Sequence, residues 1–122
     1  MKDSDIILND MTTKEEWLGI CLSRELVDKG YKPYYYKNKA KVFVNINNFY
    51  FMLIPIIDRV NKKIIFQIWV KNSWYGDGLK KCLISVTYPY NRRNFCPVNV
   101  YDAFRKHTDF WQRFDDFIST NK

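Results

Sequence analysis

The sequence predicts an α+β domain, in which a four-stranded antiparallel β-meander is flanked by an N-terminal and a C-terminal helix packed on one sheet face. Apolar residues recur at helical spacing near both ends of the chain, and a middle segment alternates apolar and polar residues between turn residues. The length of 122 residues is typical of one domain. We therefore expect a single domain over residues 1–122, with residues 1–11 as a loose lead-in.

The N-terminal helix is expected to begin after Thr13 and to extend to about Lys29. Thr13 and Glu16 have the spacing of a capping box, in which each side chain accepts a hydrogen bond from the other residue's backbone N–H. Its apolar stripe consists of Trp17, Leu18, Cys21, Leu22 and Leu26. Gly30 is suited to end the helix, and Pro33 prevents its continuation.

Four strands follow, each bounded by turn residues. They are expected at residues 39–46, 49–57, 63–71 and 80–88. Asn47 and Asn48 suit a two-residue hairpin turn because Asn tolerates positive φ, and Asn61 with Lys62 is expected to form the next turn. Pro55 lacks a backbone N–H, so the second strand is expected to be bulged there or unpaired on one side.

These turns sort the strand residues onto two faces, because antiparallel partners share a face. One face is wholly apolar and requires a cover, which the two helices can supply: Val42, Val44, Ile46, Phe49, Phe51, Leu53, Ile57, Ile64, Phe66, Ile68 and Val70. The other face mixes lysines with rings: Lys39, Lys41, Phe43, Asn45, Tyr50, Met52, Ile54, Lys63, Ile65, Gln67, Trp69 and Lys71.

One continuous C-terminal helix is expected after this sheet. Asn99 can serve as its N-cap, with Asp102 in the first turn. Its apolar stripe is Val100, Phe104, His107, Trp111, Phe114 and Ile118. The stripe places His107 in or beside the core.

Charge is segregated along the chain. Residues 1–30 carry four Lys/Arg and seven Asp/Glu, whereas residues 31–93 carry twelve Lys/Arg and two Asp/Glu. Residues 94–122 are balanced, and the formal net charge is +7. The basic middle segment also holds 14 of the 22 aromatic residues. This pattern indicates a surface that meets an anionic partner, and it excludes a DNA mimic.

The lysine and aromatic face is the candidate nucleic-acid surface. Exposed rings can stack on unpaired bases while neighbouring cations contact phosphates. The candidate phosphate contacts are Lys39, Lys41, Lys63, Lys71, Arg92 and Arg93, the candidate stacking residues are Phe43, Tyr50 and Trp69, and Gln67 lies among them. Two alternatives are open: the lysines only keep an exposed sheet soluble, or the face is buried against a protein partner or a second copy.

Trp74 and Tyr75 form a second candidate contact in a polar loop after the third strand. Trp and Tyr are favoured anchors of protein interfaces, although one ring can instead fold back over the sheet edge. The loop suggests an alternative function: a protein-binding inhibitor or regulator of the anti-defence or immunity type found in phages and other mobile elements. The Lys-, Asn-, Ile- and Tyr-rich composition is compatible with such elements.

No catalytic, metal-binding or cofactor-binding motif emerges, so a non-enzymatic protein is expected. Asp58 and Gln67 are weakly similar in placement to the acidic hairpin of metal-dependent nucleases, but the second carboxylate is missing and Trp69 occupies the expected lysine position. The three cysteines are far apart, which favours reduced, mostly buried thiols over a disulfide framework or zinc site.

The N-terminus is polar and no apolar run approaches the roughly 20 residues that span a bilayer. The sequence therefore predicts a small, basic, cytoplasmic binding protein that contacts nucleic acid or a ribonucleoprotein complex, with no membrane association and no cofactor. An acidic protein is the alternative partner, because a basic inhibitor would have to bind an acidic patch.

Overall fold

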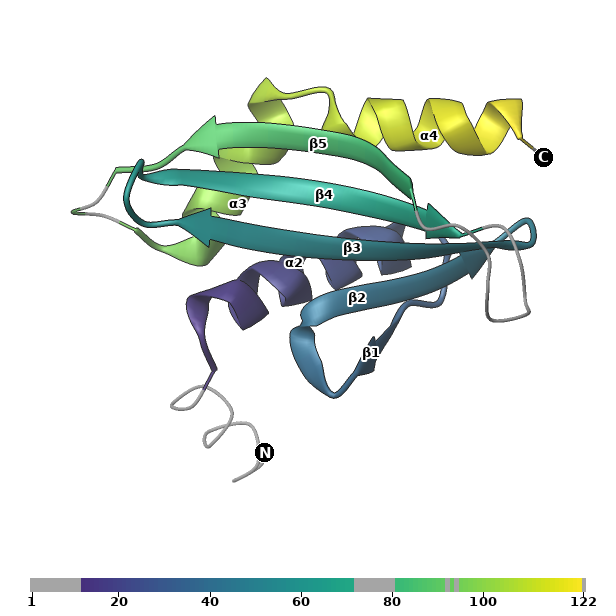
Figure 1. Cartoon of the computed structure of the whole chain (residues 1–122), viewed down its shortest axis with the longest axis horizontal. Helices are drawn as coiled ribbons and strands as arrows, with labels where there is room; N and C mark the ends of the chain where they lie inside the picture. Colours follow the sequence, from purple (N-terminus) through teal and green to yellow (C-terminus); the bar gives the residue numbers. More distant parts are fainter. Residues whose placement is uncertain (1–11, 72–80, 92, 94, 122) are drawn as a thin grey trace.

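A computed structural model describes residues 12–71, 81–91, 93 and 95–121 of the chain. The elements are α2 (Lys14–Asp28), β1 (Tyr34–Tyr36), β2 (Asn38–Ile46), β3 (Phe49–Asp58), β4 (Lys63–Lys71), β5 (Lys81–Pro89), α3 (Pro97–His107) and α4 (Phe110–Thr120). The strands form one antiparallel sheet in the order β1-β2-β3-β4-β5. The three helices lie on one side of this sheet (Figure 1). The α+β class and the meander are confirmed, and the described ranges contain one strand and one helix more than the sequence predicts.

The predicted capping box starts α2. The Glu16 backbone N–H donates to Thr13 Oγ1 at 3.1 Å, and the Thr13 backbone N–H donates to Glu16 Oε1 at 3.1 Å. The backbone hydrogen bond from Thr13 is the largest cause of the lowered pKa of Glu16. Gly30 adopts φ +95° just after the helix, a conformation that favours glycine. Both predicted ends of this helix are therefore confirmed.

The β2–β3 hairpin has the predicted two-residue turn. Asn47 and Asn48 adopt φ values of 52° and 70°, and Ile46 pairs with Phe49. Pairing of β3 with β2 stops at Leu53, before Pro55. The missing N–H of the proline therefore leaves no bond unmade in that ladder, and the prediction of a strand unpaired on one side there is confirmed.

The register predicted for the β3–β4 turn is wrong. Asp58, and not Val60, pairs with Lys63. The Asp58 carboxylate accepts hydrogen bonds at 3.1 Å from the backbone N–H groups of Val60 and Asn61, which ends the strand early. A side-chain bond from Asn61 is the largest cause of the lowered pKa of Asp58. Because the register differs by two residues, the paired residues of β3 and β4 keep their predicted faces.

The short edge strand β1 is absent from the sequence-based prediction. Tyr34 pairs with Phe43 and Tyr35 with Val42, and the register shifts between Tyr35 and Tyr36. Three consecutive tyrosines carry no apolar–polar alternation, so this strand has no pattern of its own. Its pairing depends on β2 being in place.

The predicted continuous C-terminal helix is two helices. Thr108 is extended between them, and its backbone N–H and hydroxyl both donate to Phe104 O, at 3.1 and 2.8 Å. The first of the two, α3, begins at Pro97, with Cys96 as the N-cap, so the predicted cap at Asn99 is wrong. His107 ends α3 and is exposed, which corrects its expected place near the core.

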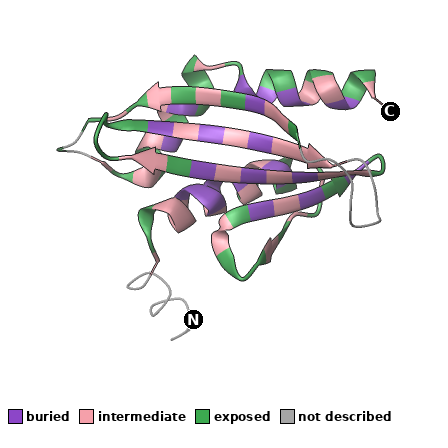
Figure 2. Cartoon of the chain, viewed as in Figure 1, coloured by how far each residue is buried: buried purple, intermediate pink, exposed green. Residues whose placement is uncertain are grey.

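The core lies between the sheet and the helices (Figure 2). Every residue of the predicted apolar face is buried in it or packs against it. The Phe66 ring stacks on Phe104 at 4.1 Å between centroids, and Phe51 meets Phe114 edge-on at 5.1 Å. The break after α3 lets both Phe104 and Phe110 reach Phe66.

Glu25 joins α2 to α3 through an ion pair with Arg105, in which the Glu25 side chain is 14% exposed and the Arg105 side chain 42%. Arg105 Nε and Nη2 donate to its carboxylate at 2.8 and 3.0 Å, and the Tyr101 hydroxyl donates at 3.1 Å. Tyr101 in turn accepts from Trp111 Nε1 at 2.8 Å. Partial burial raises the pKa of Glu25, but the bonds from Arg105 and Tyr101 outweigh it, so the pKa is lower than usual.

We expect Glu25→Gln to lower the free energy of unfolding at pH 7 by about 1–3 kcal/mol, since it removes charge-assisted hydrogen bonds. The unfolded chain binds a proton at this carboxyl near pH 4.5, whereas the folded chain binds it only at lower pH. The contribution is thus complete above about pH 4.5 and disappears as the pH falls through the folded pKa.

Urea unfolding at pH 7 and pH 3 measures this pH dependence: the loss of unfolding free energy in Glu25→Gln, relative to the wild type, should be smaller at pH 3. Glu15→Gln, at the exposed pair with Arg59, serves as the control and should cost at most about 1 kcal/mol. An equal Glu25→Gln deficit at both pH values contradicts the assignment.

Candidate binding surface on the open sheet face

The sheet face opposite the helices is not covered by any described element (Figure 1). Along β2, β3 and β4 its residues are half-buried or exposed, and they alternate with the buried residues of the core face (Figure 2). We call this surface the open face. It is the face on which the sequence places the candidate stacking residues.

A row of paired residues crosses the open face, one from each strand. Its members, in strand order, are Tyr34, Phe43, Met52, Trp69 and Cys82. The Tyr34 and Phe43 rings stack at 5.6 Å with an interplanar angle of 22°. The Trp69 indole N–H donates to Gln67 Oε1 at 3.0 Å, which fixes the orientation of the ring. Gln67 therefore positions Trp69.

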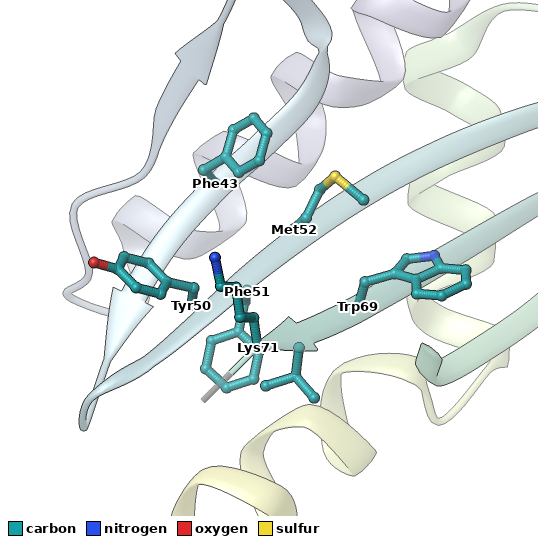
Figure 3. Close-up of a pocket in the computed structure, with 7 residues that line it drawn as sticks. Phe43, Tyr50, Phe51, Met52, Trp69 and Lys71 are labelled. Atoms are coloured by element: carbon teal, nitrogen blue, oxygen red, sulfur yellow. The ribbon is translucent and has the colours of Figure 1, made fainter. Parts of the chain in front are cut away.

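A hollow of about 340 Å³ lies beside this row (Figure 3). We call it the aromatic hollow; it is lined by Phe43, Tyr50, Phe51, Met52, Trp69, Val70 and Lys71. Tyr50 and Lys71 are direct cross-strand partners at its rim. Partial desolvation and the nearby Tyr34 raise the pKa of Tyr50, so its hydroxyl stays neutral at physiological pH. The hollow thus offers ring faces, one neutral hydroxyl and one ammonium group.

The predicted cations are distributed more widely than the rings. Lys71 lines the aromatic hollow, and Lys41 is exposed on β2, two residues before Phe43 on the same face. Lys63 lies at the opposite end of β4, where it is the cross-strand partner of Asp58. The Lys39 ammonium lies 5.9 Å from the Tyr35 ring and contributes to the lowered pKa of Glu16 on α2. Lys39 therefore turns toward the helix side at the sheet edge.

The other predicted site residues lie elsewhere. Arg93 is exposed in the segment after β5, at the far end of the sheet from the aromatic hollow. Arg92, Trp74 and Tyr75 lie outside the described residues. The structure thus brings together Phe43, Tyr50, Gln67, Trp69 and Lys71 of the predicted set. It adds Tyr34 and Met52; the alternation places Met52 on this face, but no sequence signal reveals Tyr34.

The half of the open face toward the β3–β4 turn is aliphatic. Ile56 pairs with Ile65, and Ile54 pairs with Gln67. The side chain of Ile56 is 37% exposed, and Ile54 and Ile65 are half-buried. Ser85 and Thr87 of β5 continue these rows. The open face therefore divides into an aromatic half and an aliphatic half.

The cysteines differ in environment. Cys21 is buried, and burial raises its pKa to about 11, so it is an inert thiol. Cys82 is half-buried and Cys96 is exposed, so the expectation of mostly buried thiols holds for Cys21 alone.

Comparison with known proteins assigns the chain to no family. No protein-family model, curated protein or solved structure matches the chain. Within the described ranges, no three His, Cys, Asp or Glu residues are grouped so as to hold a metal ion. No helix in the same ranges is long and apolar enough to cross a membrane.

Proposed function

We propose that this chain is a non-enzymatic binding protein that contacts single-stranded nucleic acid, alone or within a nucleoprotein complex, through the open face. The observation that carries the proposal is the aromatic hollow, where Phe43, Tyr50 and Trp69 meet Lys71 on a sheet face that none of the described helices covers. The net charge of +7 favours an anionic partner.

The chemistry of the hollow suits unpaired bases. The exposed parts of the rings can stack on bases at about 1–3 kcal/mol per base. Lys71 at the hollow and the exposed Lys41, on the same face of the sheet, are available to contact phosphates of a strand that stacks there. The Tyr50 hydroxyl can donate to a base edge or a phosphate oxygen. A duplex has no free base faces, so single strands are the favoured class of ligand.

A salt titration tests this function directly. We expect labelled single-stranded RNA or DNA to bind at low salt, and log K to fall linearly with log salt at about 0.7 per phosphate contacted. Fluorescence anisotropy measures both quantities, and a blunt duplex of equal length is the control and should bind more weakly. No binding at low salt, or binding indifferent to salt, contradicts the proposal.

The aliphatic half of the open face favours a second candidate, a protein-binding inhibitor or regulator of a mobile element. Ile54, Ile56 and Ile65 offer apolar contact area that a single strand does not require. Pull-down with and without nuclease separates the two functions. A captured partner that survives nuclease and is lost with Ile65→Asp supports the protein-binding function, whereas loss on nuclease treatment supports nucleic-acid binding.

A further inference from the structure

A second hollow, of about 500 Å³, lies at the end of the sheet beyond the β3–β4 turn. Three segments that are distant in sequence meet there: the start of α2, the β3–β4 turn and the segment after β5. We call it the basic hollow. Its lining includes Lys14, Arg59, Lys62, Tyr90, Arg93 and Phe95.

The positive charge of the basic hollow is largely uncompensated. Arg59 pairs with Glu15 at 3.1 and 3.5 Å; the Arg59 side chain is 61% exposed and that of Glu15 is 30% exposed, so water screens the pair and it contributes little. Among the described residues, neither the Lys62 ammonium nor the Arg93 guanidinium has an ion-pair partner. The four cations that line the hollow therefore have a single ion-pair partner among the described residues, the Glu15 carboxylate.

Fixed contacts hold the three segments together. The Tyr90 and Phe95 rings stack at 4.3 Å with an interplanar angle of 30°, and the Tyr90 backbone N–H donates to Lys62 O at 3.0 Å. The Lys14 ammonium donates to Phe95 O at 3.3 Å and lies 5.1 Å from the Phe95 ring centre. These contacts fix the three segments relative to one another, and they bring the four cationic side chains to the same hollow.

We propose that the basic hollow binds backbone phosphates of the nucleic-acid strand whose bases stack at the aromatic hollow. This inference rests on the function proposed above. Guanidinium groups such as those of Arg59 and Arg93 match a phosphate with two parallel hydrogen bonds, while the ammonium groups act as point charges. The nine residues of β4 separate the two ends of the sheet by about 27 Å, so only a sufficiently long strand can reach both hollows. Occupying both sites on one strand raises the affinity through effective concentration.

The test uses single-stranded oligonucleotides of about 4 and about 16 nucleotides, the range that single-strand-binding modules occupy. Arg59→Gln, Lys62→Gln and Arg93→Gln each remove one charge from an exposed side chain. The matched control is Lys106→Gln, which removes one charge from the helix side. For the long oligonucleotide we expect each variant of the basic hollow to reduce the salt slope by about 0.7 and to weaken binding several-fold at low salt. The short oligonucleotide should bind every variant like the wild type.

The outcomes separate this inference from the proposed function. If the wild type binds neither oligonucleotide, the function itself fails. If the wild type binds and the hollow variants keep the wild-type salt slope on the long strand, the function stands and the inference is overturned. An effect of Lys106→Gln equal to that of Arg93→Gln also overturns it, because the attraction is then due to net charge alone. Thermal unfolding of each variant verifies that the fold is intact.

Discussion

Gly19→Ala is expected to lower the free energy of unfolding by roughly 2–4 kcal/mol, although alanine is the better helix former. A Cβ atom at this position would lie 1.8 Å from Lys39 O and 3.3 Å from Ala40 Cα. Both are backbone atoms, so no rotamer change can relieve the clash. Helix α2 would have to move away from β2 and open the core around Leu18 and Leu22.

Urea unfolding of Gly19→Ala measures the cost of this close approach. Arg24→Ala, at an exposed position of the same helix, controls for helix propensity and should change the stability by less than about 0.5 kcal/mol. Gly30→Ala isolates backbone strain, because this residue has φ +95° with open space around it, and it should cost about 1 kcal/mol. A Gly19→Ala variant as stable as the wild type contradicts the close contact between α2 and β2.

Local sequence patterns predict the faces of the sheet better than its edge. The two-residue turn at Asn47 and Asn48 fixes the alternation of β2 and β3, and a register difference of two at the next turn preserves that alternation. The core face and the placement of Phe43, Tyr50 and Trp69 could therefore be predicted from the sequence.

Features that depend on tertiary contacts could not be predicted in the same way. β1 is too short to show a pattern, and it brings Tyr34 onto Phe43 only because β2 offers an edge. The side chain of Lys39 turns to the helix side, where its ammonium lies near the Tyr35 ring and the Glu16 carboxylate. Strand alternation alone does not predict this orientation. The basic hollow joins three segments that no local motif connects.

The break in the C-terminal helix was predictable in part. Thr108 and Asp109 are cap-type residues, and they lie where α3 ends and α4 begins. The apolar spacing continues through them, however, because the buried residues of both helices face the same core. A continuous stripe therefore indicates a shared face, and the cap-type residues inside it indicate the break.

The double substitution of Phe43 and Trp69 by alanine is expected to weaken single-strand binding by at least about 2 kcal/mol, roughly 30-fold in Kd. Both rings are half-buried on the open face. Met52 lies between them in the row of paired residues that crosses this face. Their removal deletes two of the three candidate stacking rings and leaves Tyr50, Lys71 and Lys41 in place. The salt slope should therefore stay near the wild-type value while the affinity falls, whereas the variants of the basic hollow should lower both the salt slope and the affinity.

Two further variants show whether stacking, and not apolar contact in general, explains the loss. Trp69→Phe keeps a ring face and should retain most of the affinity, whereas Trp69→Leu keeps an apolar side chain without a ring and should not. Ile65→Ala removes apolar area from the aliphatic half of the same face and should leave single-strand binding unchanged. If Trp69→Leu binds as well as Trp69→Phe, or if Ile65→Ala weakens binding as much as the loss of a ring, the open face recognises its partner by apolar area. The protein-binding function would then be the better explanation of this surface.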